Sequence, residues 1–278
     1  MSVMTDTGDY VLGHSSEELD RLISQSRFLG ELSEHLLRLA GLQPGMRVLD
    51  VGCGSGDVSF LAARIVGPGG SVTGIDRSPE SVAMATTRAN AAGLANVRFQ
   101  TADAASFALD EPADALIGRL VLMYWPDAGA VVRNLARSVK PGGIITFQDY
   151  DLEGSKSEPW SPLFEASLDR IRQAFARAGA ETRMGLKLGR AFEDAGLPTP
   201  RMLLCARVER GAESEAYHQV AEVTRTLLPL MERTGVATAE AVDIATLKSR
   251  LKEEALALRA TQVAPPLVGA WTRKPAEG

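Results

Sequence analysis

Short apolar runs alternate with longer segments of helical periodicity through the first half of the chain. The apolar runs at 48–51, 71–76, 97–101, 113–118 and 143–148 have the length of buried strands. The segments at 57–66, 79–92 and 126–138 repeat apolar residues at helical spacing, and clusters of glycine and proline separate the two kinds of segment. This alternation predicts an α/β fold with a Rossmann-like, doubly wound and mostly parallel sheet that binds its ligand at the carboxyl ends of the strands.

Two helices are predicted ahead of the first strand. The first covers Ser15 to Phe28, where a serine can cap the helix and Glu18 lies in its first turn. The second ends before Gly41 and has one apolar face, made of Leu29, Leu32, Leu36 and Leu39. We therefore expect a helical N-terminal leader over residues 1–43, followed by a core over residues 44–151.

After residue 151 the pattern changes. The segment 153–159 is polar and rich in turn residues, so it is expected to be a loop. Two helices follow, at 164–175 and 188–195, and residues 202–208 resemble a strand. Residues 212–260 are again helical, and 263–271 can supply the last strand of a seven-stranded sheet. Residues 152–278 therefore combine the end of the sheet with an inserted helical cap at about 212–260.

The composition is that of an ordinary globular protein, with 45% hydrophobic and 23% charged residues in 278. A net charge of −5 argues against nucleic acid as a substrate, since proteins that neutralise phosphates carry a basic surface. Only Cys53 and Cys205 are present, which indicates reduced thiols. No apolar stretch is long enough for a membrane span and no signal peptide is recognisable, so a cytoplasmic location is expected.

The most informative segment is the run from Val48 to Gly56, which joins an apolar strand to a helix through a glycine turn. Gly52 and Gly54 allow positive φ and close approach of a ligand to the backbone. A second strand follows and ends at Asp76, where doubly wound sheets hold ribose hydroxyls. The turn lacks the glycine spacing of NAD-binding proteins and is flanked by Asp50 and Asp57, which would repel a pyrophosphate but attract a cation.

These residues resemble the first two motifs of class I S-adenosylmethionine-dependent methyltransferases, whose cofactor carries a sulfonium and an ammonium. The resemblance continues through Thr101-Ala102-Asp103-Ala104, the run Gly118 to Asp127 and Lys140-Pro141-Gly142-Gly143, and covers about residues 44–150. It implies the fold and S-adenosylmethionine as cofactor, and says little about the acceptor.

The resemblance also implies a set of cofactor contacts. Asp103 and Ala104 would lie beside adenine, Arg77 could stack on it, and Arg119 would meet the methionine portion. Two residues of the leader, Tyr10 and Gln25, would help to close the site. The full set of expected cofactor-binding residues is Asp50, Gly52, Cys53, Gly54, Asp76, Arg77, Asp103, Ala104, Arg119, Gln25 and Tyr10.

Methyl transfer is an in-line displacement in which positioning dominates, so a strong base is not required. The candidates for a catalytic group are Asp149 and Tyr150 after the fifth strand and His218 at the start of the cap. A metal is not expected, because Arg119 replaces the acids that metal-dependent members of the family carry after the fourth strand.

We expect an enzyme that methylates a small, apolar or aromatic metabolite. The expected partners are this small-molecule acceptor, with no nucleic acid and no membrane, and a homodimer is compatible with the sequence. Two alternatives stay open at this point: a protein that binds S-adenosylmethionine without transferring its methyl group, and an NAD-dependent oxidoreductase.

Overall fold

The computed structural model describes residues 16–276, and the side chains of residues 28–276. The chain divides into two compact units. Of the described residues, the sheet unit comprises 29–150, 184–205 and 267–276, and the helical unit comprises 16–28, 151–183 and 206–266. The long helix α1 (Ser16–Ala40) contributes residues to both. No helix of the described residues is both long enough and apolar enough to cross a bilayer.

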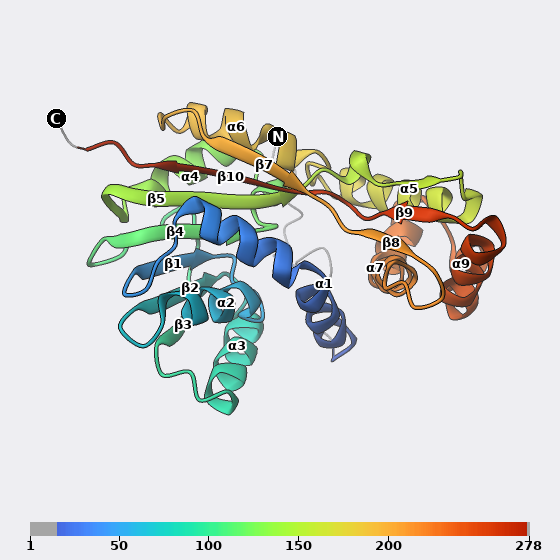
Figure 1. The fold of residues 1–278 in the computed structure, drawn as a ribbon, viewed down its shortest axis with the longest axis horizontal. Helices are drawn as coiled ribbons and strands as arrows, with labels where there is room; N and C mark the ends of the chain where they lie inside the picture. Colours follow the sequence, from blue (N-terminus) through green and yellow to red (C-terminus); the bar gives the residue numbers. More distant parts are fainter. Residues whose placement is uncertain (1–15, 277–278) are drawn as a thin grey trace. The chain divides into compact units, whose positions relative to one another are not determined.

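The sheet unit contains seven strands in the order β3-β2-β1-β4-β5-β10-β7, which confirms the predicted fold (Figure 1). The first five are parallel, and β10 runs antiparallel to both of its neighbours. The strands are β1 (Arg47–Val51), β2 (Ser71–Asp76), β3 (Val97–Thr101), β4 (Ala113–Arg119), β5 (Val139–Tyr150), β7 (Arg201–Cys205) and β10 (Leu267–Arg273).

Helices cover both faces of this sheet, and two residues of β10 show how they are divided. A Cβ added to Gly269 would meet the side chain of Leu36 in α1, whereas a Cβ on Gly185 would meet Val268. Because successive strand residues point to opposite faces, α1 and the helix of Gly185 pack on opposite sides. The helices that follow α1 in this unit are α2 (Asp57–Val66), α3 (Pro79–Ala91), the 3-10 turn η1 (Leu122–Tyr124), α4 (Ala128–Ala136) and α6 (Met184–Asp194).

The helical unit contains a small antiparallel sheet that the sequence analysis missed. Its strands have the order β6-β9-β8, and helices α5, α7 and α9 belong to the same unit (Figure 1). The elements are η2 (Leu152–Gly154), β6 (Lys156–Glu158), α5 (Pro162–Arg177), β8 (Val208–Arg210), α7 (Ala216–Arg233), α8 (Ala239–Val242), α9 (Ile244–Leu258) and β9 (Thr261–Val263).

The prediction of a loop over 153–159 is therefore wrong for the second half of this segment, which forms β6. In β6, the backbone N–H and the hydroxyl of Ser157 donate to the buried carboxylate of Glu165, at 2.7 and 2.9 Å. Ser157 also pairs with Gln262 of β9, more than a hundred residues along the chain. Such distant partners stabilise a polar strand whose local pattern indicates a turn.

Two further boundaries differ from the sequence prediction. The two predicted leader helices form one continuous helix, α1, because no proline interrupts it and the single Gly30 costs only about 1 kcal/mol of helix propensity. The predicted last strand at 263–271 is split into β9 and β10. Pro265 and Pro266 lie between them, and neither residue has the N–H that a strand ladder uses.

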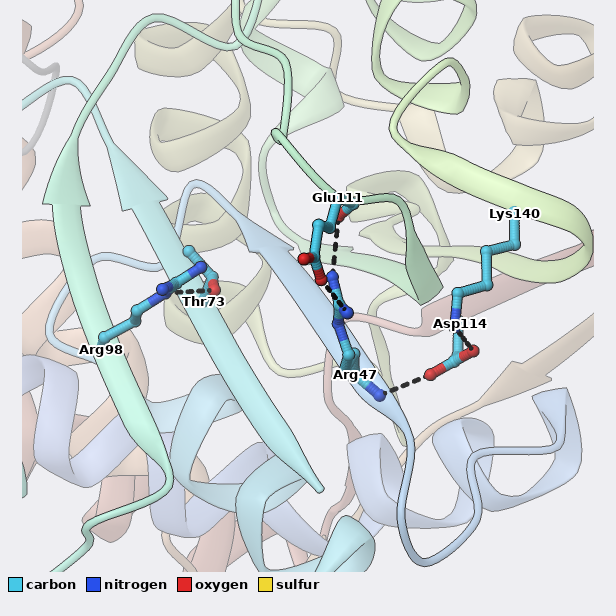
Figure 2. A network of polar contacts seen from close by, with 6 residues as sticks. All are labelled: Arg47, Thr73, Arg98, Glu111, Asp114 and Lys140. Carbon is cyan, nitrogen blue, oxygen red and sulfur yellow. Dashed lines mark hydrogen bonds and ion pairs between the residues drawn. The ribbon is translucent and has the colours of Figure 1, made fainter. Parts of the chain in front are cut away.

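A network of charged residues joins three strands near their amino ends (Figure 2). Asp114 of β4 accepts from the backbone N–H of Arg47 at 2.8 Å and from Lys140 Nζ at 2.6 Å. Burial alone would raise the pKa of Asp114, but these hydrogen bonds outweigh it and hold the pKa below its usual value. The Arg47 guanidinium also pairs with Glu111. Because strands β1, β4 and β5 are parallel, this network lies at the end of the sheet opposite to the glycine turn.

Candidate active site

The turn between β1 and α2 leaves one backbone face open to a ligand. Gly52 and Gly54 have φ of 65° and 51°, in the left-handed region. A Cβ on Gly52 would lie 2.6 Å from Val121 Cγ2, whereas a Cβ built on Gly54 has no heavy atom of the described residues within 4 Å apart from its chain neighbours. Gly52 is therefore needed for packing against the loop after β4. Gly54 faces open space, as close approach of a ligand to the backbone requires.

Asp76 ends β2 beside this turn. Its Oδ2 accepts from the backbone N–H of Gly54 at 2.9 Å, and its Oδ1 accepts from that of Ser78 at 2.9 Å. A carboxylate offers about four acceptor positions, so each oxygen retains capacity for one more donor. The carboxylate thus fixes the turn against β2 and can still accept from a vicinal diol.

Asp50 lies beneath the turn and is almost completely buried. Ser59 Oγ donates to its Oδ2 at 2.5 Å. Burial raises the pKa of Asp50 to about 7, against the hydrogen bond from Ser59 and the charge of Arg119, which act to lower it. Near neutral pH this carboxyl is therefore only partly ionised.

Asp57, the acid on the other side of the turn, forms an ion pair whose positive partner compensates its charge. Arg88 of α3 donates from Nη2 to Asp57 Oδ1 at 2.8 Å. The negative charge that the sequence analysis assigned to Asp50 and Asp57 is therefore weaker in the folded protein. Arg88 was missed because it lies thirty-one residues from Asp57 and belongs to no motif.

Arg119 is held at the end of β4 by contacts with α1. Its Nη1 donates to Ser33 Oγ at 3.0 Å, and Gln148 Nε2 donates to the backbone oxygen of Ser33 at 3.3 Å. Burial lowers the pKa of Arg119 from its usual value, against the charges of Asp57, Tyr150 and Asp50. Sequence reasoning singled out Arg119, but it did not identify Ser33 or Gln148 as partners.

Asp149 supports the loop that follows β4. Its Oδ2 accepts from the backbone N–H groups of Leu122 and Met123 at 3.1 and 3.2 Å, and its Oδ1 from that of Tyr150 at 3.2 Å. The side chain is fully buried, and burial raises its pKa to about 7 although these bonds favour the charged form. The loop it supports contains Leu120, whose φ of 55° is rare for a residue with a branched side chain.

The remaining expected cofactor contacts differ in their exposure. Asp103 is exposed, and its Oδ1 accepts from the backbone N–H of Ala105 at 2.9 Å, while Ala104 is buried. Arg77 is exposed. Cys53 is buried in the turn, and burial raises the pKa of its thiol well above the usual value, so it stays protonated.

The other expected residues lie in different parts of the chain. Tyr10 lies outside the described residues, and Gln25 lies in α1, within the part whose side chains are not described. Tyr150 is half-buried at the end of β5, in the sheet unit. His218 is half-buried in α7, which belongs to the helical unit.

Comparison with known proteins bears on this arrangement. A family model described as a methyltransferase domain matches residues 42–196, which is more than half of the chain. The chain belongs to this methyltransferase-domain family. The match begins just before β1 and extends past α6, so it includes the glycine turn, Asp76 and the loop after β4.

Relatives of this methyltransferase-domain protein have varied names. The ubiquinone biosynthesis O-methyltransferase of Paracidovorax citrulli is 38% identical over 194 residues, covering 66% of this chain and 72% of that protein. An uncharacterized protein of Mycobacterium tuberculosis is 31% identical over 206 residues, covering 72% and 71%. A solved structure of a putative methyltransferase from Bacillus halodurans has a TM-score of 0.57 at 18% identity, covers 88% of this chain and 99% of that chain, and shows the shared fold.

Family membership decides among the three possibilities that the sequence left open. The protein is a methyltransferase, and its methyl donor is S-adenosylmethionine. The NAD-dependent oxidoreductase and the protein that binds the donor without transferring its methyl group are set aside.

Proposed function

We propose that this methyltransferase binds S-adenosylmethionine at the glycine turn and transfers the methyl group in line to a small, apolar or aromatic acceptor. When bound, the cofactor supplies an electrophilic methyl group on a sulfonium. The observation that carries the proposal is the open backbone face at Gly54 next to the Asp76 carboxylate, which retains free acceptor positions. This is the geometry that a ribose with two neighbouring hydroxyls requires.

We assign parts of the cofactor to residues of the turn and of the strand ends. Asp76 would accept from the ribose hydroxyls, and hydrogen bonds to a charged group contribute about 1.5–3 kcal/mol each. Arg119, already oriented by Ser33, would pair with the methionine carboxylate. Asp103, Ala104 and Arg77 would contact adenine, as the family resemblance implies. Asp50, Gly52, Cys53 and Gly54 form the turn and its support.

The chemistry we propose depends on positioning. Correct orientation of two reactants can account for about 7–11 kcal/mol of the barrier, whereas a general base adds about 10²–10⁴-fold. The oxygens of Asp149 accept from three backbone N–H groups, which supports a role in orienting the loop after β4. Tyr150 and His218 are the proposed candidates for contact with the acceptor or its departing proton.

The acceptor class is proposed from the names of relatives. Besides the ubiquinone biosynthesis enzyme, they include a nocamycin O-methyltransferase of Saccharothrix syringae and a 2-phytyl-1,4-naphtoquinone methyltransferase of Synechococcus elongatus. Two of these names contain a quinone, which is a conjugated ring system whose reduced form, the quinol, is a phenol. An arsenite methyltransferase is also among the relatives, so inorganic acceptors belong in any screen.

A homodimer is proposed from the edge of the large sheet. Strand β7 ends the sheet, and within the described residues no strand pairs with its outer edge. Its residues Met202, Leu203 and Leu204 are 40%, 36% and 49% exposed, and such an edge is a template for a second strand. Antiparallel pairing of two copies about Leu203 would place Arg201 opposite Cys205, so that the two arginines do not face each other.

The acceptor proposal is tested with purified protein and methyl-labelled S-adenosylmethionine. The panel should contain quinols, phenols, polar amines and arsenite at equal concentrations, and Asp76→Ala serves as a control with impaired cofactor binding. We expect label in the quinols or phenols with the wild type and a large decrease with the variant. Label found only in polar amines or arsenite would contradict the proposed acceptor class.

A further inference from the structure

Arg88 lies in α3 and contacts the glycine turn at Ser55 and Asp57, at the point where the turn leads into α2. Its Nη1 donates to the backbone oxygen of Ser55 at 2.6 Å, and its Nη2 donates to Asp57 Oδ1 at 2.8 Å. The hydroxyl of Ser55 donates to the second oxygen of Asp57 at 2.8 Å. One guanidinium therefore connects α3 with both the backbone of the turn and the first residue of α2.

The same guanidinium also contacts an aromatic pair, Phe60 and Phe99, through the ring of Phe60. The Arg88 Cζ lies 5.2 Å from the centroid of the Phe60 ring, and this ring meets that of Phe99 edge to face at 5.9 Å. Both rings occupy space that two glycines leave free. A Cβ on Gly56 would lie 2.7 Å from Phe60, and one on Gly74 would lie 2.6 Å from Phe99. Arg88 thus packs on the ring of Phe60, and the rings of Phe60 and Phe99 themselves pack tightly against Gly56 of the turn and Gly74 of β2.

The turn needs such support because its glycines have high conformational freedom in the absence of other constraints. Within the turn, the backbone N–H of Gly56 donates to the oxygen of Cys53 at 2.9 Å, and that of Gly54 donates to Asp76. The Gly54 bond connects the turn to β2, and the Gly56 bond closes the turn on itself. The N–H of Gly56 and the carbonyl of Ser55 belong to one peptide group, so Arg88 binds the second polar end of that group and connects it to α3 and to the first residue of α2.

We propose that Arg88 is a positioning residue for the cofactor, which holds the glycine turn in its binding conformation without touching the ligand. The proposal rests on the cofactor site proposed above. A turn ordered before binding loses less conformational entropy when the ligand arrives, so the affinity is higher. The role belongs to the pair of Arg88 and Asp57, because Asp57 presents the carboxylate that fixes the guanidinium over Ser55.

The test measures binding of S-adenosylhomocysteine by calorimetry, since this demethylated product of the cofactor binds without turnover. In Arg88→Met we expect the dissociation constant to rise about tenfold, equivalent to about 1.4 kcal/mol. Arg88→Lys should recover only part of the loss, because a single ammonium cannot reproduce the two directed bonds of the guanidinium. The double variant of Arg88→Met with Asp57→Asn should bind no more weakly than the poorer single variant, since both changes disrupt one interaction.

Lys140→Met is the matched control. Lys140 forms an ion pair of 2.6 Å with Asp114 in the same unit, at the end of the sheet opposite to the turn (Figure 2). This variant removes an ion pair of similar length and should leave the dissociation constant unchanged. Melting temperatures of all variants, measured without ligand, separate lost affinity from lost stability.

Two results would count against the assignment, and they can be told apart. If wild-type protein binds S-adenosylhomocysteine and Arg88→Met binds it equally well, Arg88 has no positioning role. If Arg88→Met and Lys140→Met weaken binding to the same degree, the effect is general and the assignment is wrong. Absence of binding by the wild type would overturn the proposed cofactor site itself. Should Arg88→Met not fold, Arg88→Lys and Asp57→Asn provide the same comparison.

Discussion

Replacement of Asp149 by asparagine should change how the stability of the protein depends on pH. In the unfolded chain this carboxyl has a pKa near 3.8, and burial raises it to about 7 in the folded protein. Between these two values the unfolded state is ionised while the folded state keeps its proton. The stabilisation associated with this group is therefore complete below pH 3.8 and is lost as the pH rises through about 7.

The magnitude follows from the size of the shift. Each pH unit in this window changes the free energy of unfolding by about 1.4 kcal/mol per group. From about pH 5 to about pH 7.5 the wild type should thus lose about 2–3 kcal/mol through Asp149. Asp149→Asn cannot ionise and lacks this loss. The variant is expected to be less stable than the wild type at pH 5, because an amide group cannot accept from all three N–H groups, and this deficit should shrink at pH 7.5.

Urea unfolding at both pH values measures the difference between wild type and variant. Asp114→Asn is the control, because the pKa of Asp114 is lowered and it is ionised in both states throughout the window. A deficit of Asp149→Asn that stays constant with pH would refute the reasoning. Measuring kcat for Asp149→Asn also tests whether Asp149 acts as a general base. Loss of a general base would lower kcat by about 10²–10⁴-fold.

Four further substitutions test other parts of the account. Asp76→Ala should raise the dissociation constant for S-adenosylmethionine about tenfold in a calorimetric titration, and unchanged affinity would remove Asp76 from the site. Gly52→Ala should lower the free energy of unfolding by about 2–4 kcal/mol, since a positive φ and contact with Val121 both oppose a side chain, whereas Gly54→Ala should lose cofactor affinity with a smaller loss of stability. Leu203→Glu should convert a dimer to a monomer in light scattering, and a monomeric wild type would contradict the proposed dimer.

The features that sequence alone predicts are local ones. The glycine turn and Asp76 lie within about 25 residues of each other, and both belong to one strand-turn-helix-strand unit. Strand and helix periodicity in that stretch agrees with the tertiary fold, so the predicted parallel sheet is confirmed. The family resemblance rests on short runs of this local kind, such as the segment from Val48 to Gly56.

The features that sequence does not predict depend on distant contacts. Arg88 reaches the turn from thirty-three residues beyond Ser55, and Ser33 meets Arg119 across eighty-six residues. Strand β6 is polar, and its pairing with β9 is invisible in its own pattern. Charge was also misjudged for this reason. Asp50 and Asp57 are both acidic in the sequence, but in the folded protein burial raises the pKa of Asp50 and the positive charge of Arg88 compensates that of Asp57.

A crystal structure of the protein with S-adenosylhomocysteine tests the central claim most directly. The account predicts that both ribose hydroxyls donate to the Asp76 carboxylate at about 2.5–3.0 Å, with the ligand against the open face of Gly54. A ligand bound elsewhere, with no contact between its ribose and Asp76, would contradict the account.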